Sequence, residues 1–397
     1  MKNITDNVSW VGVEDWDAAT FHGREYSTYN GTSYNSYLVR DQKTALIDTV
    51  RQPFAAEFLS QLRQDIDLSA IDYVICNHSE PDHSGALPEL MREIPGKPIY
   101  CTAFGAKALQ GQYHQDWNYV TVKTGDRIDL GQNQLIFIEA PMLHWPDSMF
   151  TYLMGEGILF SNDAFGQHYA TEGLYNNQAD QTELYAEAIK YYANILTPFS
   201  SFVTNKINEI LSYNLPLNMI CPSHGVIWKD NPGQIVELYL QWANNYQENQ
   251  ITLVYDTMWN ATLQMAEAIA QGISMADPSV MVRLMNSSIR DKSDIMTEIF
   301  RSKAILLGSP TFNNGYLYSI AGILEMAKGL KFKNKKAAAF GSYGWSGEAV
   351  AQLTQGLNES GFSVVNDGLR MLWVPDEAGV AACREFGARF VQALNAV

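Results

Sequence analysis

The sequence predicts an α/β protein with more than one domain, the last of which is a doubly wound parallel sheet. At 397 residues, the chain is long enough for two or three domains of ordinary size. Apolar residues make up 46% and charged residues 18% of the chain, which excludes disorder and coiled coils. Beyond residue 250, β-rich runs and helical stretches alternate regularly, a pattern typical of parallel sheets with helices on both faces.

Residues 1–249 predict a first, layered α/β domain. Their β-rich runs cluster before residue 161, and helical stretches follow at 181–211, with a break near Pro198, and at 234–245. Clustered strands with helices outside them indicate a layered fold whose loops lie at the strand ends. The predicted strands are 36–39, 45–48, 73–76, 98–101, 135–139, 150–154 and 158–161.

Residues 250–397 predict a second domain built from five βα units. Ligands of such sheets bind beyond the carboxyl ends of the strands. The sequence around Asn249 contains no Pro/Gly/Ser linker, so we expect the two domains to touch. The predicted strands are 251–255, 281–284, 304–307, 337–340 and 363–365, and the predicted helices lie near 261–272, 292–300, 319–329, 346–359 and 377–394.

Charge and cysteine usage restrict the protein's partners and compartment. The formal net charge is −16, and all of it lies in residues 1–250, because residues 251–397 hold 13 basic and 13 acidic residues. This acidic excess argues against nucleic acid or an anionic membrane as the partner. No apolar run approaches the roughly 20 residues of a membrane span, and no secretory signal opens the chain. The four scattered cysteines favour a reducing cytoplasm.

The strongest local motif is His78-Ser79-Glu80-Pro81-Asp82-His83, directly after the predicted strand 73–76. It places four possible metal ligands within six residues, in a chain with only seven histidines. Three further candidates follow later predicted strands, although His144 or His224 alone would more often be a structural histidine. Four imidazoles and three carboxylates suit two metals, with one carboxylate able to bridge. The candidate ligands are His78, Glu80, Asp82, His83, His144, Asp163 and His224.

Three loops of the second domain form a plausible cradle for a flat ring with a phosphate tail. The first loop is polar and opens a helix, whose N-terminal N–H groups can hold phosphate, although hydroxyls there are more often caps. No G-x-G-x-x-G motif follows any of the strands, which disfavours a dinucleotide site. The candidate cofactor residues are Thr257, Met258, Trp259, Asn260, Ala261 and Thr262; Ser309, Pro310, Thr311, Phe312, Asn313 and Gly315; and Ser342, Tyr343, Gly344, Trp345, Ser346 and Gly347.

These motifs resemble a known family. The first domain is similar to the metallo-β-lactamase superfamily, except that Glu80 replaces the second histidine of its H-x-H-x-D-H motif, which favours iron or manganese over zinc. H-x-E-x-D-H with the three later ligands resembles the flavodiiron proteins, as do Trp10-Val11-Gly12, Tyr34-Asn35-Ser36-Tyr37 and Pro141–Asp147. Residues 251–397 resemble flavodoxin, although Trp259-Asn260 replaces its usual Thr-Gly.

The resemblance implies a fold and a set of cofactors. We expect an N-terminal metallo-β-lactamase-like αββα sandwich followed by a C-terminal flavodoxin-like doubly wound sheet, with two non-haem iron ions and FMN. His22 and His168 are candidate groups for hydrogen bonding to a bound diatomic molecule; for each, packing in the interior or exposure to solvent is an equal alternative. One iron would take His78, Glu80 and His144, the other Asp82, His83 and His224, with Asp163 bridging.

The resemblance also implies an activity and partners. The expected reaction reduces NO to N2O, O2 to water, or both, with FMN re-reducing the irons. Overall similarity is greatest to the core of flavorubredoxins, and because no paired C-x-x-C of a rubredoxin is present, we expect an external rubredoxin-like donor. The family implies a head-to-tail homodimer or a dimer of dimers. Lys328, Lys331, Lys333, Lys335 and Lys336 either dock the donor or belong to a solvated loop.

Two other classes of protein compete with this interpretation. A dizinc hydrolase of the metallo-β-lactamase superfamily would need no flavin, which argues against it. A flavodoxin-like electron carrier with a vestigial metal domain would not need the complete set of seven ligands.

Overall fold

The computed structural model describes residues 1–395, which form two compact units. The first unit comprises residues 1–21, 28–192 and 199–243, and the second comprises residues 22–27, 193–198 and those from 244 onward. The predicted domain boundary after residue 249 lies inside a strand, β17 (Glu248–Tyr255). Within the described residues, no helix combines the length and the apolar character that a bilayer crossing demands.

The first unit contains two main sheets that face each other. In the larger sheet, neighbouring strands are antiparallel from β1 to β8 and parallel from β8 to β11. Its strands run in the order β1 (Lys2–Asn3), β2 (Val8–Trp10), β7 (Tyr37–Arg40), β8 (Thr44–Ile47), β9 (Tyr73–Ile75), β10 (Ile99–Cys101), β11 (Tyr119–Thr121). The second sheet runs in the order β12 (Arg127–Asp129), β13 (Gln134–Glu139), β14 (Met149–Leu153), β15 (Ile158–Asn162), β16 (Met219–Pro222).

The two sheets bury one apolar core between them. Alternate residues of the strands point inward, so Tyr37 and Val39 of β7 meet Phe137 of β13 and Phe160 of β15 in one cluster. Short strands β3 (Val13–Asp15) and β6 (Thr32–Tyr34) pair beside this sandwich, and β4 (Thr20–Phe21) and β5 (Tyr26–Ser27) complete the strands that precede β7.

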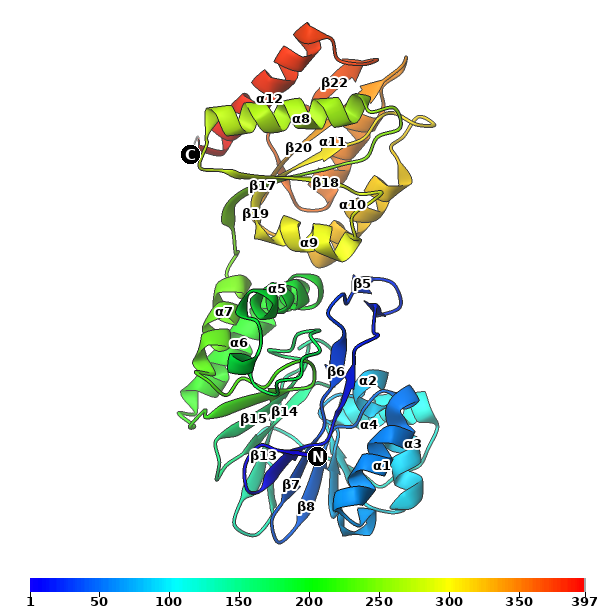
Figure 1. Cartoon of the computed structure of the whole chain (residues 1–397), viewed down its shortest axis with the longest axis vertical. Coiled ribbons are helices and arrows are strands. Elements are labelled where there is room, and N and C mark those ends of the chain that lie inside the picture. Colours follow the sequence, from blue (N-terminus) through cyan, green and yellow to red (C-terminus); the bar gives the residue numbers. More distant parts are fainter. Residues whose placement is uncertain (396–397) are drawn as a thin grey trace. The chain divides into compact units, whose positions relative to one another are not determined.

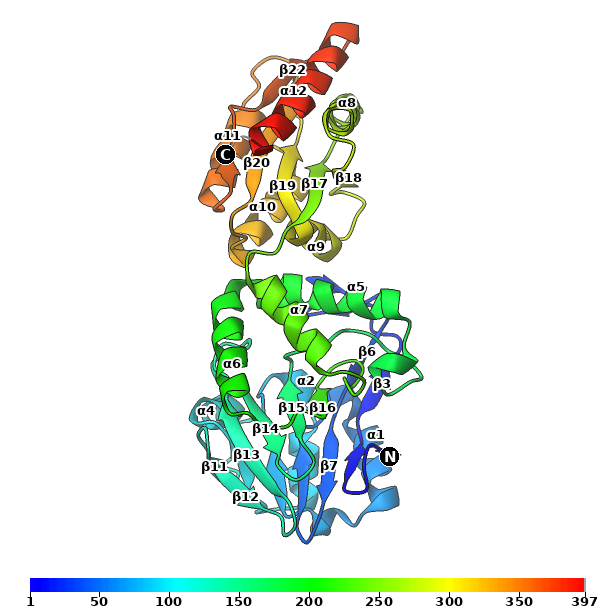
Figure 2. The same cartoon turned by 90° about the vertical axis from the view of Figure 1, so that its left-hand side faces the viewer.

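Helices cover the outer faces of both sheets, which gives the predicted αββα sandwich (Figures 1 and 2). The predicted helix 181–211 is interrupted by a π-helical turn at Tyr192–Leu196 and a 3-10 turn at Thr197–Phe199, which contains Pro198. Beside the larger sheet lie α1 (Ala55–Asp65), α3 (Leu87–Glu93) and α4 (Ala103–Tyr113), and beside the second lie α6 (Ser200–Ser212) and α7 (Gly233–Ala243). The short helix α2 (Pro81–Ser84) follows β9, and α5 (Gln181–Tyr191) crosses the ends of the strands.

The second unit is built on a parallel sheet with the order β18-β17-β19-β20-β21. This is a doubly wound order: successive strands are added on one side of β17 and then on the other, so the strand order reverses between the first and third strands, here β17 and β19. The final strand is split, because a turn at Gly368 (φ +84°) separates β21 from β22, which also pairs with β20. The sequence prediction missed β22. The strands after β17 are β18 (Met281–Asn286), β19 (Ser302–Gly308), β20 (Lys336–Tyr343), β21 (Ser363–Val364) and β22 (Leu369–Leu372).

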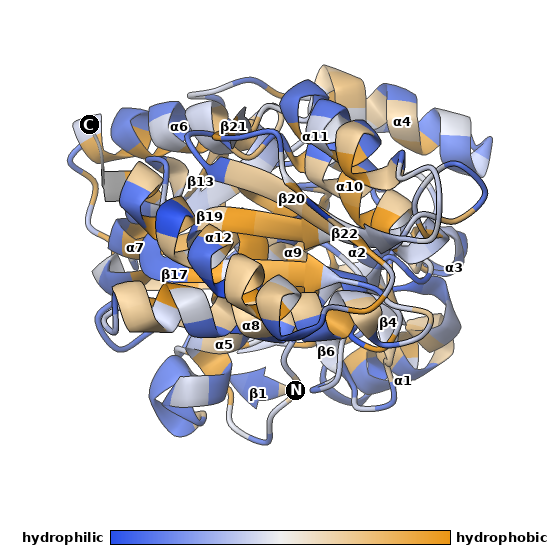
Figure 3. Ribbon diagram, turned by 90° about the horizontal axis from the view of Figure 1, so that it is seen from above, coloured by the Kyte–Doolittle hydropathy of each residue, from blue (hydrophilic) through white to orange (hydrophobic). Residues whose placement is uncertain are grey.

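Helices α8 and α12 pack over one face of this apolar sheet (Figure 3). Gly272 of α8 and Gly387 of α12 permit a close approach, since a Cβ on Gly272 would lie 2.0 Å from the carbonyl oxygen of Arg384. A Cβ on Gly387 would lie 2.2 Å from the carbonyl oxygen of Ile269. The five helices are α8 (Ala261–Ala276), α9 (Lys292–Arg301), α10 (Tyr318–Leu330), α11 (Ala349–Glu359) and α12 (Glu377–Asn395).

Candidate metal centre and cofactor cavity

All seven predicted metal ligands lie in loops that follow strands of the first unit, or in the short helix after one. The loop after β9 carries His78 and Glu80, and α2 continues it with Asp82 and His83. Gly85 allows α2 to lie close to the turn at 52–54, because a Cβ there would lie 2.4 Å from the backbone nitrogen of Gln52. The remaining three ligands follow β13, β15 and β16, so they meet the first four only through the pairing and stacking of the two sheets.

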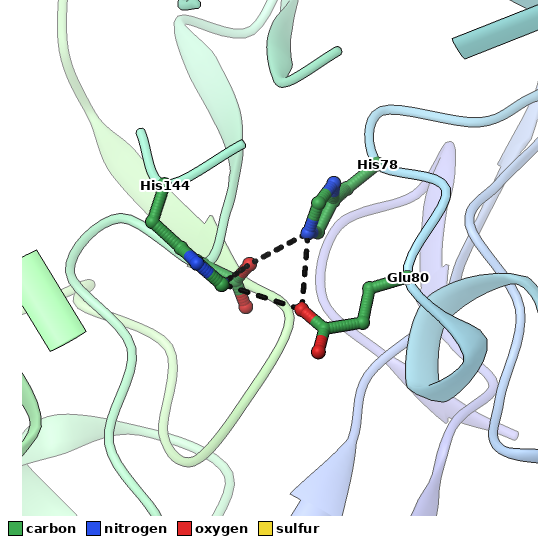
Figure 4. A group of neighbouring side chains, drawn as sticks. His78, Glu80 and His144 are labelled. Carbon is green, nitrogen blue, oxygen red and sulfur yellow. Dashed lines mark hydrogen bonds and ion pairs between the residues drawn. The ribbon is translucent and has the colours of Figure 1, made fainter. Parts of the chain in front are cut away.

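The first ligand group consists of His78, Glu80 and His144, which point toward one another (Figure 4). The Nε2 atoms of both imidazoles lie 3.3 Å from Glu80 Oε2. Asp163 Oδ2 completes the group, at 3.5 Å from His78 Nε2 and 3.4 Å from His144 Nε2. Two imidazoles and two carboxylates therefore surround one point.

The second ligand group consists of Asp82, His83 and His224. The Nε2 atoms of His83 and His224 lie 3.3 and 3.1 Å from Asp82 Oδ2. Asp163 faces this group with its other oxygen, Oδ1, which lies 3.1 Å from His83 Nε2 and 3.4 Å from His224 Nε2. The two oxygens of one carboxylate thus face two adjacent ligand groups, which is the geometry of a bridging ligand.

The pocket's chemistry fits a pair of cations. His224 Nδ1 lies 2.7 Å from the carbonyl oxygen of Ser33, which can only accept, so Nδ1 carries a proton and Nε2 is the nitrogen that faces Asp82 and is left to bind a metal. Three buried ligand atoms without a hydrogen-bond partner also indicate a missing cation: Asp82 Oδ1, His83 Nε2 and Asp163 Oδ2. Lone pairs facing carboxylate oxygens require a cation between them.

The pKa shifts of the ligand imidazoles show the same demand for positive charge. Burial alone would lower the pKa of His144, but hydrogen bonds to Asp163 and Glu80 raise it to about 9. Burial opposes the protonation of His224 in the same way, yet Asp163 and Asp82 raise its pKa to about 10. The pocket takes up protons because its carboxylates need counter-charge, and metal ions meet that need equally well.

One further residue, which the sequence did not single out, touches the centre. Tyr191, the last residue of α5, donates a hydrogen bond from its hydroxyl to Asp163 Oδ1 at 3.0 Å. Its position in the sequence gives no signal, because only the tertiary packing of α5 brings this residue to the centre.

The two predicted accessory histidines occupy different surroundings. His168 is buried, with Nδ1 2.8 Å from Thr32 Oγ1 and its ring centroid 5.0 Å from that of His224. His22 lines a small pocket with Tyr26 and Met326 of the second unit. A role for either histidine toward a bound diatomic molecule stays a prediction.

The second unit contains a cavity of about 640 Å³ beyond the carboxyl ends of β17, β19 and β20. Thirteen of the eighteen predicted cofactor residues line it: Thr257, Met258, Trp259, Ala261, Pro310, Thr311, Phe312, Asn313, Ser342, Tyr343, Gly344, Trp345 and Ser346. Asn314, Trp373 and Val374 also line it. The sequence prediction missed these three, of which the last two follow the unpredicted strand β22.

The other five predicted cofactor residues are absent from the cavity lining. Thr262 Oγ1 lies 3.0 Å from Ser342 Oγ, and Ser309 Oγ accepts a hydrogen bond from the Leu317 N–H at 3.0 Å. Asn260 precedes α8 in the left-handed region (φ 64°). The remaining two are Gly315, whose backbone pairs with that of Phe312, and Gly347 (φ +80°), which approaches the ring of Tyr343.

The cavity suits a flat ring with an anionic tail. Thr257 Oγ1 is buried and has no hydrogen-bond partner, just before the N-terminus of α8, where a phosphate would be stabilised. Aromatic side chains at the rim, including Trp345, supply surfaces for stacking. The same end of a doubly wound sheet, at its switch point, is where such folds bind mononucleotides.

Comparisons with known proteins identify both domains. Residues 32–225 match the ODP family beta lactamase domain, and residues 253–387 match flavodoxin. The chain is 55% identical over 386 residues to the anaerobic nitric oxide reductase flavorubredoxin of Escherichia coli (strain K12 / DH10B), covering 97% of this chain and 80% of that protein.

Solved structures show the same fold over the whole chain. Rubredoxin oxygen:oxidoreductase from Desulfovibrio gigas is 36% identical, with a TM-score of 0.95 and 100% coverage of both chains. The flavodiiron protein from Giardia intestinalis is 32% identical, also with a TM-score of 0.95, over 100% of this chain and 97% of that one.

A β-lactamase-type unit with two adjacent ligand groups, joined to a flavodoxin unit, defines a class of redox flavoproteins with a metal centre. The chain belongs to the flavodiiron protein family. The fold class predicted from the sequence is therefore confirmed.

Proposed function

We propose that this protein is a flavodiiron oxidoreductase that reduces NO, O2 or both at a non-haem diiron site re-reduced by FMN. The reactions are 2 NO + 2e⁻ + 2H⁺ → N2O + H2O and O2 + 4e⁻ + 4H⁺ → 2 H2O. Relatives named for each substrate, a nitric oxide reductase and an oxygen oxidoreductase, support both. The flavodoxin unit argues against the alternative, a dizinc hydrolase, because hydrolysis does not use a flavin.

The observation that carries this proposal is the position of Asp163 between the two ligand groups. Its oxygens would bridge two irons, of which one takes His78, Glu80 and His144 and the other Asp82, His83 and His224. When bound, the irons would hold and polarise the diatomic substrate, and FMN would supply electrons.

The protein's own residues fix this geometry and shield it from water. Tyr191 holds Asp163 through its hydroxyl, which orients the carboxylate between the two groups. The indole of Trp145 stands edge-on to the His78 ring, with centroids 5.0 Å apart, and adds apolar surface beside the first group. Six of the seven ligand side chains are at most 11% exposed and Glu80 is 14% exposed, so the pocket is largely dry.

We propose that the external donor is rubredoxin-like and acidic, and that it docks on exposed lysines of the second unit. Four of the five clustered lysines are exposed: Lys328, Lys331, Lys333 and Lys336. The prediction was wrong for Lys335, which is only 3% exposed. Its ammonium donates to the carbonyl oxygens of Phe300 and Ser302 at 2.7 and 2.6 Å, so it is part of the domain's interior.

Charge reversal tests this docking surface. Lys328, Lys333 and Lys336 changed together to Glu should slow donor-driven turnover at low salt, because steering by charge governs the encounter rate. The matched control reverses Lys97, Lys107 and Lys123 of the first unit. Equal rates for the two triple variants would contradict the proposed surface, as would a deficit that high salt does not diminish.

We further propose a head-to-tail homodimer or a dimer of dimers. Exposed aromatic side chains gather around the flavin cavity, and both Trp259 and Trp345 are 86% exposed. Such surfaces are commonly covered by another subunit. Analytical ultracentrifugation would contradict this by finding only monomer at micromolar concentration.

We also propose that the protein works in the reducing cytoplasm, because its four cysteines are buried free thiols.

Metal analysis and a visible spectrum test the function. The proposed enzyme is yellow and carries about two irons and one FMN per chain, and anaerobic stopped-flow mixing of the reduced protein with NO and with O2 gives its preference. Colourless protein with zinc and esterase or lactamase activity would establish the hydrolase instead. Flavin without iron, after reconstitution with Fe(II), would indicate an electron carrier.

A further inference from the structure

Asp147 forms a buried anchor outside the set of seven ligands. Its carboxylate is 4% exposed, and one oxygen, Oδ2, gathers three polar groups. His78 Nδ1 lies 3.0 Å from it, and both the backbone N–H and the hydroxyl of Ser79 donate to it at 2.7 Å. One carboxylate oxygen therefore holds a metal-ligand imidazole and the residue that follows it.

This anchor also fixes the tautomer of His78. A carboxylate oxygen that accepts both donors of Ser79 is an acceptor toward the imidazole as well, so the proton sits on Nδ1. The lone pair of Nε2 then points at the centre, toward Glu80 and Asp163. A carboxylate on the outer nitrogen orients a ligand imidazole and raises its basicity.

Asp147 connects the two loops that supply the first ligand group. It lies three residues after His144, while His78 and Glu80 lie on the other loop. Its own backbone is held in turn, because Thr102 Oγ1 donates to the Asp147 carbonyl oxygen at 2.9 Å. The Asp147 carboxylate thus sets the distance between the loops that must close around one metal.

The second ligand group has a different support. The outer nitrogen of His224 contacts a neutral peptide carbonyl, that of Ser33, at 2.7 Å. A carboxylate carries a full charge and a carbonyl only a partial one, so the two imidazoles differ in donor strength. The fold therefore distinguishes the two metal positions even though their ligands are of the same kinds.

We propose that Asp147 is a positioning residue. It selectively raises the iron affinity of the position formed by His78, Glu80 and His144, and this makes the two irons inequivalent. This inference rests on the proposed diiron site. The effect acts through His78 and through the spacing of the two loops, and Asp147 itself contacts neither substrate nor metal.

The test compares iron retention in the whole protein. Wild type and Asp147→Asn are loaded anaerobically with ⁵⁷Fe(II), and iron loss to a chelator is followed while Mössbauer spectra are recorded. The matched control is Asp41→Asn, because Asp41 Oδ2 also accepts from three donors, the Gln132 N–H and the backbone and side chain of Asn133, and these lie outside the loops that carry metal ligands. Ser79→Ala removes one of the three donors to Asp147 and keeps the His78 contact.

In Asp147→Asn, one of the two irons should be lost about 10–100-fold faster, as is usual when such an outer partner is removed, and the other at the wild-type rate. Only one of two Mössbauer doublets should change. Asp41→Asn should match wild type, and Ser79→Ala should show the same one-sided effect, a few-fold in size.

Wild-type retention of both irons in Asp147→Asn would overturn the inference, as would equal acceleration of both losses. Should Asp147→Asn not fold, as judged by circular dichroism, Ser79→Ala decides, and a symmetric or absent effect there overturns the inference. Fewer than two irons in wild type would instead count against the proposed function.

Discussion

Glu80 offers the sharpest test of how the two ligand groups divide the metals. Its Oε2 atom is the shared neighbour of His78 Nε2 and His144 Nε2, 3.3 Å from each, which places Glu80 in the first ligand group. Glu80→Ala therefore removes one of the four ligand residues around the first position. The second position keeps all of its ligands.

The size of the effect follows from the number of ligands. Four-ligand zinc sites in zinc-finger peptides contribute about 10–16 kcal/mol of apparent binding free energy, or roughly 3 kcal/mol for each ligand, and we take this as the scale for one ligand here. Losing one ligand should then weaken metal retention about 100-fold at one position. We expect iron to fall from about two to about one per chain after dialysis against a moderate chelator, while FMN stays at one per chain because a separate unit binds it.

The assay measures iron by inductively coupled plasma mass spectrometry and FMN by the absorbance of released flavin. Glu57→Ala is the control, since Glu57 is an exposed carboxylate on α1 that contacts Gln61 rather than the metal pocket. Retention of two tightly held irons in Glu80→Ala would refute the assignment of Glu80. Loss of iron and FMN together would refute the independence of the two sites.

Three further outcomes test the second unit. Gly272→Ala should lower the free energy of unfolding by about 1–3 kcal/mol, because its Cβ would lie 2.0 Å from the Arg384 carbonyl oxygen, whereas Gly329→Ala, with nothing within 4 Å, should not; urea melts measure both. Lys335 has a pKa that burial lowers from 10.5 to about 7, so the unfolded chain binds more protons between these values and stability should rise with pH across that window. Lys335→Met should remove this pH dependence. The total change in the free energy of unfolding across the window is at most about 5 kcal/mol, because the carbonyl acceptors favour the ammonium. Urea melts of both proteins at pH 7 and 10 measure it. Trp345→Ala should weaken FMN retention about tenfold through lost stacking, with iron content unchanged, as flavin fluorescence titration would show.

Much of the fold and of the metal centre could be read from the sequence because their signals are local. The doubly wound sheet follows from strands and helices that alternate along the chain, and the structure confirms a parallel sheet there. The types and spacing of the six residues from His78 to His83 are enough to predict a metal site. The three loops that line the cavity of the second unit could be singled out because polar and glycine residues stand directly after apolar strands.

The features that the sequence left hidden depend on residues that are distant along the chain. Tyr191 is one of 21 tyrosines, and only the placement of α5 brings its hydroxyl to Asp163. Lys335 looks like its exposed neighbours in the sequence, yet its position directly before the buried strand β20 turns it inward.

The sequence by itself therefore determined which donor groups the protein has, and that they follow strands. The tertiary structure alone decided how they are grouped: Asp163 lies between two sets of ligands, the Asp147 carboxylate lies behind the His78 imidazole, and a peptide carbonyl lies behind that of His224. The physical reason is that donor chemistry belongs to each side chain, whereas a distance of 3 Å between loops is set by strand pairing and by the packing of one sheet on another.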